Sequence, residues 1–148
     1  MAEEEGQVIA VKTVDSWKDH FQKGKDSKKL VSSQTNLNFS ITFTLFSLRS
    51  LQFKVVVDFT ASWCGPCRFM APILAEIAKK TPHVIFLKVD VDELSSVSEE
   101  WSIEAMPTFL FLKEGELVDK VVGANKDQLQ ATIAKHAAST VVTSTVVA

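Results

Sequence analysis

The sequence lacks the cysteines that would hold a small secreted domain together. It has only two, Cys64 and Cys67, among 148 residues. A single pair within one motif argues against a disulfide-stapled secreted fold and favours a reducing compartment. A basic excess is also absent, because the formal net charge is −2 and lysines and acids are mixed along the chain. The sequence therefore indicates no nucleic-acid-binding surface, and we expect protein partners instead.

The sequence shows no pattern typical of a targeting segment or a membrane-spanning segment. Residues 1–6 are acidic and have neither the apolar core of a secretory signal nor the basic residues of a transit peptide. The uncharged stretch within residues 31–54 is too short and too polar to cross a membrane. We therefore expect a cytoplasmic protein without a membrane span. Hydrophobic residues make up 46% of the sequence, which is ample for the core of one domain over 1–148.

Hydrophobic periodicity predicts alternating strands and helices, and hence an α/β fold. We expect strands at 7–12, 53–60, 84–90, 107–112 and 117–122, and helices from Thr13 to about Gly24, after residue 64, at 92–101 and at about 126–136. Strand–helix–strand order implies parallel crossovers, whereas residues 113–116 read as an exposed hairpin turn. The prediction is a central mixed sheet flanked by helices. Residues 137–148 have no charge or capping signal and are expected to form a flexible tail.

The most informative motif is Trp-Cys-Gly-Pro-Cys at 63–67, where a buried strand is expected to pass directly into a helix. Two cysteines three residues apart on a first helical turn lie within the Cα separation that a disulfide requires. The pair can also be a structural disulfide or half of a zinc site. Zinc needs four ligands, however, and the only other candidates are three scattered histidines. Redox use is the favoured interpretation.

The two cysteines are expected to differ in role because they differ in position. Cys64 lies at the helix start, where unpaired N–H groups and the helix dipole favour a thiolate, so we expect it to be the attacking sulfur. Cys67 lies one turn inside the helix and is expected to be the resolving sulfur. Gly65 keeps the approach to Cys64 uncrowded, and Pro66 presets the backbone for a first helical turn.

The motif and its surroundings resemble the thioredoxin family, and most closely the plant h type. The resemblance covers residues 7–30 and 55–136 and includes Asp58, Lys88, the Met106-Pro107-Thr108 sequence and Gly123. It implies a thioredoxin fold and a monomeric protein-disulfide reductase without a cofactor or metal. Its implied partners are disulfide-containing target proteins and an NADPH-dependent thioredoxin reductase.

Two charged residues on the predicted buried strands are candidates for proton transfer. Asp58 interrupts an apolar strand, and a buried carboxylate is costly unless it is paired or protonated. Burial raises the pKa of such a group, so Asp58 can take the Cys67 proton through a water, as the resemblance implies. The alternative is an aspartate that caps a backbone group. Lys88 is implied to be its charge partner, although a solvated strand end is an alternative for this residue.

The resemblance also implies a surface that binds targets around Cys64. Met106 and Pro107 match the family's cis-proline site, where the Met106 backbone pairs with an extended substrate segment. An ordinary proline at the start of an edge strand is the alternative. Trp63 and Gly123 frame the same apolar surface. The full predicted substrate-binding set is Trp63, Gly65, Pro66, Met106, Pro107 and Gly123.

Other functions on the same fold remain open at this point. A binding or holdase module is one, but the intact cysteine pair and Asp58 argue against it. An oxidant or isomerase is another, which the Gly-Pro pair between the cysteines disfavours by resemblance. An isoform impaired by its own insertion is the third.

Residues 31–54 are an insertion of about two dozen residues relative to the family pattern. Phe39, Ile41, Phe43 and Leu45 alternate with serine and threonine, which is typical of a half-buried strand. A functional loop, an extra edge strand before the central strand and a translated intron are the three possible origins. We favour the intron, because U-rich codons encode most of the segment. Val31-Ser32 can be read from GUAAGU and Leu51-Gln52 from UUGCAG, which resemble splice sites.

Overall fold

The computed structural model describes residues 6–26, 54–82 and 84–137. In chain order these residues form β1 (Val8–Val11), α1 (Val14–Asp26), β2 (Lys54–Thr60), α4 (Gly65–Lys80), β3 (Val84–Asp90), α5 (Ser95–Glu100), β4 (Thr108–Lys113), β5 (Glu116–Val122) and α6 (Lys126–Ala137). The predicted insertion, apart from its last residue, and the predicted tail after residue 137 lie outside the described residues. No helix in the described part of the chain is long and apolar enough to span a membrane.

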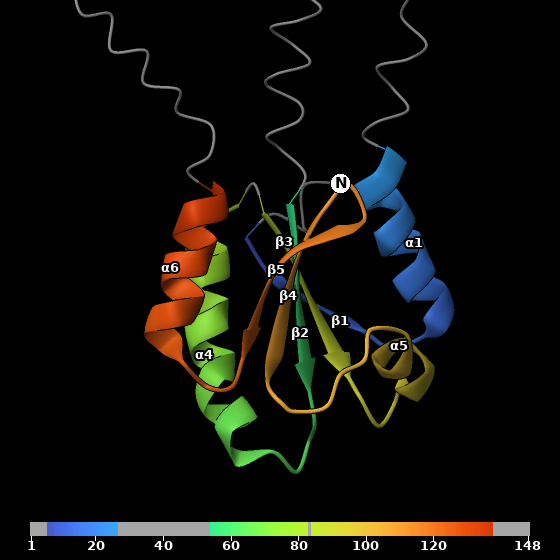
Figure 1. Ribbon diagram of the computed structural model, residues 1–148, viewed down its shortest axis with the longest axis horizontal. Coiled ribbons are helices and arrows are strands. Elements are labelled where there is room, and N and C mark those ends of the chain that lie inside the picture. Colours follow the sequence, from blue (N-terminus) through green and yellow to red (C-terminus); the bar gives the residue numbers. More distant parts are fainter. Residues whose placement is uncertain (1–5, 27–53, 83, 138–148) are drawn as a thin grey trace, which may run out of the picture.

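The five strands form one mixed sheet in the order β1-β3-β2-β4-β5 (Figure 1). β3 runs parallel to both β1 and β2, whereas β4 is antiparallel to β2 and to β5. The predicted mixed sheet flanked by helices is therefore confirmed. β2 lies at its centre, and the carboxyl end of β2 leads directly into α4.

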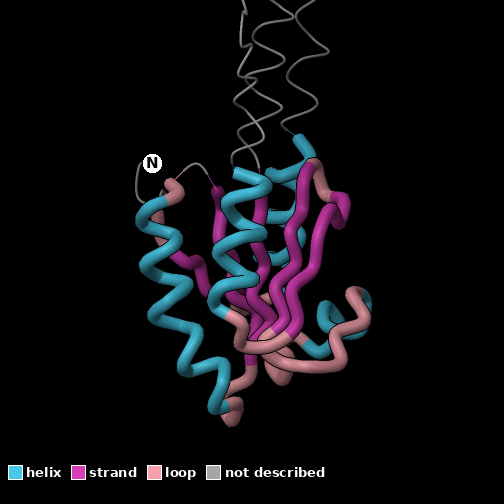
Figure 2. Tube along the Cα trace, turned by 60° about the vertical axis from the view of Figure 1, so that its left-hand side comes forward, coloured by secondary structure: helices cyan, strands magenta, loops and turns pink. Residues whose placement is uncertain are grey.

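Helices cover both faces of the sheet. α4 and α6 lie together on one face, and α1 and α5 lie on the other (Figure 1). In Figure 2, where this side of the molecule comes forward, α4 and α6 stand in front of the strands. Val57 and Phe59 pack into the core with Trp17 of α1, while Val56 packs with Met70 of α4. Because side chains alternate along a strand, Asp58 and Thr60 point to the same face as Val56, toward α4.

Three local predictions are wrong in detail. The first helix does not fade at Gly24 but continues to Asp26. The helix expected at 92–101 begins only at Ser95 and has no acidic residue in its first turn. In the last helix the apolar pattern predicts that Leu129, Ile133 and Ala134 face the sheet. Leu129 and Ile133 are buried as predicted, whereas Ala134 is exposed. The buried face of this helix is formed by Leu129 and Ile133, and Ala134 lies just beside it. Alanine is found on buried and exposed helix faces alike, so its presence does not predict burial.

The predicted hairpin between β4 and β5 is confirmed, with Lys113 paired to Glu116. Its two turn residues, Glu114 and Gly115, have φ values of 54° and 79°. Positive φ at both positions is the geometry of a type I′ turn, which matches the right-handed twist of the flanking strands. The turn therefore holds β5 against β4 at the edge of the sheet.

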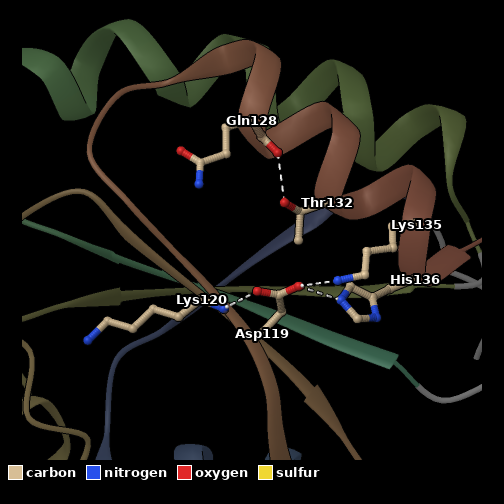
Figure 3. Close-up of polar contacts among 6 residues, drawn as sticks. All are labelled: Asp119, Lys120, Gln128, Thr132, Lys135 and His136. Carbon is tan, nitrogen blue, oxygen red and sulfur yellow. Dashed lines mark hydrogen bonds and ion pairs between the residues drawn. The ribbon is translucent and has the colours of Figure 1, made fainter.

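The last helix is joined to the edge strand by a small cluster of charges (Figure 3). Oδ2 of Asp119 on β5 lies 3.2 Å from Nζ of Lys135 and 2.9 Å from Nε2 of His136, both on α6. The hydrogen bond with His136 is the main cause that lowers the pKa of Asp119 to about 2. The His136 ring also packs on Phe111 of β4. These contacts fix the C-terminal turn of α6 on the sheet, far from the β2–α4 connection.

Candidate active site

Cys64 and Cys67 lie where β2 passes into α4. Cys64 is the N-cap residue of α4, and its Sγ accepts a hydrogen bond from the backbone N–H of Cys67 at 3.2 Å. The two residues are joined by a disulfide, with their Cα atoms 5.3 Å apart. The predicted position of the pair at the start of a helix is thus confirmed. A pair at this position can open and close with little backbone movement.

Exposure does not distinguish the two sulfurs in this oxidised form. Each cysteine is 5% exposed. The difference lies in the surrounding backbone, because the first N–H groups of α4 point toward Cys64. An added Cβ at Gly65 would meet no atom within 4 Å, so the space beside Cys64 is open as predicted.

Asp58 is the one acidic side chain in the core formed by residues 6–26, 54–82 and 84–137. It is 5% exposed, and its Oδ1 atom has no hydrogen-bond partner, so the alternative in which Asp58 caps a backbone group finds no support at this oxygen. Burial raises the pKa of Asp58 from its ordinary 3.8 to about 7, an effect that the charge of Lys88 partly offsets. A carboxyl group with this pKa can both accept and release a proton near neutral pH.

Lys88 is the direct neighbour of Asp58 across the β2–β3 pair. The residue is exposed, and among the described side chains no ion pair joins it to Asp58. Its effect on Asp58 is therefore that of a nearby charge in the same sheet face. Lys88 is thus exposed to solvent, and its charge also acts on Asp58.

A pocket of about 180 Å³ opens beside this pair, between the ends of β2 and β3 and the start of α4. Asp58 is not among the residues that line this pocket. The wall is formed by Thr60, Ala61, Ser62, Cys67, Arg68, Ala71, Lys88 and Asp90. The pocket therefore connects the Cys67 side of the disulfide with solvent. The sequence reasoning did not single out Thr60, Arg68 or Asp90.

The loop before β4 reaches the other side of the disulfide. The peptide bond between Met106 and Pro107 is cis, and the carbonyl oxygen of Met106 lies 3.6 Å from Sγ of Cys64. The N–H of Gly123 donates to the carbonyl oxygen of Pro107 at 2.8 Å. Gly123 has a φ of 93°, where a side chain would be strained. These three predicted residues thus lie together at the end of the β4–β5 pair.

Apolar surface surrounds the pair on the outside. Trp63 is 64% exposed, and its Nε1 donates to Oδ2 of Asp92 at 2.9 Å. Pro66 is exposed as well. The apolar pattern after Cys67 predicts that Phe69 is one of the apolar positions of α4. Phe69 is nevertheless 60% exposed and lies three residues from Pro66 on the outside of the helix. Asp92 was missed because nothing in the sequence places it beside Trp63.

No metal centre is found among the residues that the structure describes. No group of three or more His, Cys, Asp and Glu side chains is close enough there to hold an ion. The sulfurs of Cys64 and Cys67 are bonded to each other. The arrangement fits dithiol–disulfide exchange.

Comparison with known proteins gives a consistent result. The family model described as Thioredoxin matches residues 42–135. Thioredoxin H-type 2 of Nicotiana tabacum is 59% identical over 137 residues, covering 93% of this chain and 96% of the relative. Thioredoxin H1 of Arabidopsis thaliana is 56% identical over 138 residues, covering 93% of this chain and 100% of the relative. The crystal structure of the thioredoxin NaTrxh from Nicotiana alata superposes with a TM-score of 0.68 at 40% identity, covering 90% and 96% of the two chains.

Proposed function

The chain belongs to the thioredoxin family and is a thiol–disulfide oxidoreductase, and from this premise we propose that it works as a reductant of protein disulfides, with the roles of its residues divided as follows. The observation that supports this most directly is the Cys64–Cys67 disulfide at a helix N-terminus, with a buried carboxyl group of raised pKa behind it. The reaction moves two electrons from the dithiol to a target disulfide.

Cys64 is the attacking sulfur and Cys67 the resolving sulfur. In the reduced protein the N–H of Cys67, which donates to Sγ of Cys64 in the oxidised form, is in place to stabilise a Cys64 thiolate. That thiolate attacks one sulfur of the target, and the other target sulfur leaves. Cys67 then attacks Sγ of Cys64, closes the disulfide and releases the second target thiol.

Asp58 serves as the base in the second step. A thiol must lose its proton before it attacks, and Cys67 of α4 is only 5% exposed. Asp58 lies on the same side of the sheet as Cys67, and its pKa of about 7 suits a base that works at neutral pH. Lys88 keeps a useful fraction of this carboxyl ionised by its positive charge.

The target chain binds over the surface formed by Trp63, Gly65, Pro66, Met106, Pro107 and Gly123. The Met106 carbonyl lies beside the reacting sulfur, so an extended target segment can pair with this backbone while its disulfide faces Cys64. Exposed apolar area at Trp63 supplies contact without demanding one particular sequence.

The partners and setting follow from the same premise. An NADPH-dependent thioredoxin reductase returns the disulfide to the dithiol, so the protein is a monomeric electron carrier with no cofactor of its own. It acts in the cytoplasm, where a reducing environment favours the dithiol state.

Reduction of insulin tests this function. Reduced protein in catalytic amounts, with NADPH and a plant thioredoxin reductase, should cause insulin precipitation together with NADPH oxidation. The Cys64→Ser variant is the matched control and should show neither. Insulin reduction by the Cys64→Ser variant would show that the proposal is wrong. Absence of insulin reduction by the native protein would show the same.

A further inference from the structure

The pocket beside Cys67 contains a buried hydroxyl group that the reaction described above does not use. Thr60 is the last residue of β2, is 6% exposed and lines the pocket together with Cys67. A pocket of about 180 Å³ is large enough for several water molecules. A hydroxyl on its wall can hold one of these waters by donating and accepting a hydrogen bond.

The Thr60 hydroxyl is available for this purpose. Within the described part of the chain its Oγ1 makes no hydrogen bond, whereas its backbone carbonyl accepts from the N–H of Val91. Thr108, the buried threonine on β4, differs because its hydroxyl donates to the Ala105 carbonyl at 2.6 Å. Thr60 Oγ1 is not among the described buried side-chain atoms that lack a partner, so this hydroxyl is reached by solvent and can bind a water in the pocket.

Asp58 and Thr60 are successive side chains on the same face of β2. Asp58 does not line the pocket, and its Oδ1 is buried without a hydrogen-bond partner among the described residues. On β4 the neighbour of Asp58 is Phe109, which offers neither a donor nor an acceptor side chain. Thr60, the next residue on the same face of β2, and Lys88, the neighbour of Asp58 on β3, both line the pocket with Cys67. Of the two, only Thr60 has a side chain that can both donate and accept a hydrogen bond.

We propose that Thr60 is a positioning residue whose hydroxyl holds the water through which Cys67 passes its proton to Asp58. The proposal rests on the base role of Asp58 proposed above. As Cys67 attacks Sγ of Cys64, the bond between these sulfurs forms and the bond from Cys64 to the target sulfur breaks. The Cys67 proton moves to the water, and a proton of that water moves to Asp58. The released target thiolate takes its proton from solvent.

The charged groups around this path are few. β3 contributes Lys88 and Asp90, and α4 contributes Arg68 beside Cys67. Thr60→Val removes none of these charges and keeps nearly the same side-chain volume. Its effect should therefore depend on pH in one particular way. It should be large near neutral pH, where Cys67 needs a base, and vanish above the ordinary thiol pKa of about 8.5, where the thiolate forms by itself.

The test measures the lifetime of the mixed disulfide in a single turnover. Reduced full-length protein is mixed with a synthetic peptide that contains one disulfide, quenched with acid and analysed by mass spectrometry. Thr60→Val should lengthen this lifetime about three- to ten-fold at about pH 7 and leave it unchanged at about pH 9.5. Thr60→Ser should restore the native lifetime. Ser62→Ala, which removes an exposed hydroxyl from the rim of the same pocket, is the matched control and should change nothing.

A cycle with Asp58→Asn separates this proposal from the base role on which it rests. Thr60→Val should add no further delay to Asp58→Asn. A normal lifetime in Thr60→Val beside a slow Asp58→Asn would overturn the role of Thr60 alone. A delay that persists at high pH, or that multiplies with Asp58→Asn, would overturn it as well. A normal lifetime in Asp58→Asn would overturn both roles. If Thr60→Val does not fold, Thr60→Ala carries the same expected and contrary outcomes.

Discussion

At the scale of single residues, Cys64 and Cys67 are equally buried, at 5% each, and differ mainly in which backbone groups face their sulfurs. The N–H of Cys67 donates to Sγ of Cys64, and no such donor faces Sγ of Cys67 among the described residues. Stabilisation of a thiolate by a helix N-terminus is therefore confined to Cys64. The proposed difference in role between Cys64 and Cys67 therefore rests on the electrostatics of the helix N-terminus.

The cysteine variants test this asymmetry. Cys67→Ser should still attack but lack the resolving sulfur, so mixed disulfides with target proteins should accumulate and appear on non-reducing gels. Cys64→Ser should form none, because its remaining sulfur lacks the stabilising N–H groups. In the native reduced protein an alkylating reagent at neutral pH should label Cys64 first. Faster labelling of Cys67 would reverse the two roles.

Asp58 carries a cost in stability that depends on pH. Its folded pKa of about 7 lies above its ordinary 3.8, so between these values the folded protein binds more protons than the unfolded chain. Stability therefore falls as pH rises from about 4 to about 7, and the loss is complete above pH 7. A difference of about three pKa units corresponds to roughly 4 kcal/mol.

Asp58→Asn should remove this cost while slowing the reaction. In the oxidised protein the variant should be more stable by a few kcal/mol at about pH 8 and by little at about pH 4, because the native carboxyl is neutral there. Urea unfolding at the two pH values measures the difference. Insulin reduction should be slower near neutral pH. Equal stabilisation at both pH values would show that the Asp58 charge is not the cause, and an unchanged rate from pH 6 to pH 9 would exclude the base role.

At the scale of elements, Asp119 of the edge strand β5 connects to the C-terminal turn of α6 through Lys135 and His136. The side chains of Asp119 and Lys135 are 30% and 70% exposed, so solvent weakens their attraction. The lowered pKa of Asp119 means that this contribution is present above about pH 4 and is lost as pH falls toward 2. The cluster is therefore a modest clamp on the C-terminal turn of α6.

Asp119→Asn should lower the free energy of unfolding by less than about 1 kcal/mol at neutral pH. The difference in the free energy of unfolding between the variant and the native protein should shrink below about pH 4. Below that pH Asp119 is protonated in the unfolded chain, and the stability that its lowered folded pKa provides is progressively lost. Glu76→Gln is a suitable control, since Glu76 pairs with Lys79 inside α4 and joins no second element. Hydrogen exchange of the last turn of α6 should rise in Asp119→Asn alone. Equal effects of both substitutions would remove the argument for a clamp.

The elements themselves could largely be predicted from the sequence, because each strand carries a period of two or a continuous apolar run. Errors arose where tertiary contacts override local pattern. Phe69 fits the apolar stripe of α4 and yet faces solvent, and α5 is shorter than its acidic start suggests. The cysteine pair, Asp58 and the Met106-Pro107 loop could be assigned because the family resemblance connects residues far apart in the chain. Thr60 and Asp92 could not, since their relevance depends on side-chain placement beside Cys67 and Trp63.

At the scale of the whole molecule, the two ends of the sheet are separate. α1 ends and β2 begins at one end, while the β2–α4 connection with Cys64 lies at the opposite end (Figure 1). β2 has seven residues, and at about 3.3 Å per residue its ends are roughly 20 Å apart. Changes in the chain between Asp26 and Lys54 therefore enter the fold far from the chemistry.

The last prediction concerns the insertion at residues 31–54, whose boundary needs one correction. Lys54 is already part of β2, paired with Val84 and Lys113, so the deletion that tests the insertion should remove residues 31–53. Shortening this connection from about 27 residues to about four should lower the closure cost by roughly 1.5–2 kcal/mol. The deletion also removes the uncharged, β-prone stretch at 39–48, which can pair between chains.

We expect the deleted protein to reduce insulin within a few fold of the full chain and to be more soluble and more stable. Enzyme assay, urea unfolding and light scattering measure the three properties, and sequencing of the transcript tests the intron origin independently. The site should survive because Cys64, Cys67, Asp58 and Thr60 all lie beyond the start of β2, and β2 pairs with β3 and β4 along its whole length or most of it. A full chain that is active while the deleted protein is not would mean that residues 31–53 are a working part of the molecule, and the intron interpretation would then be wrong.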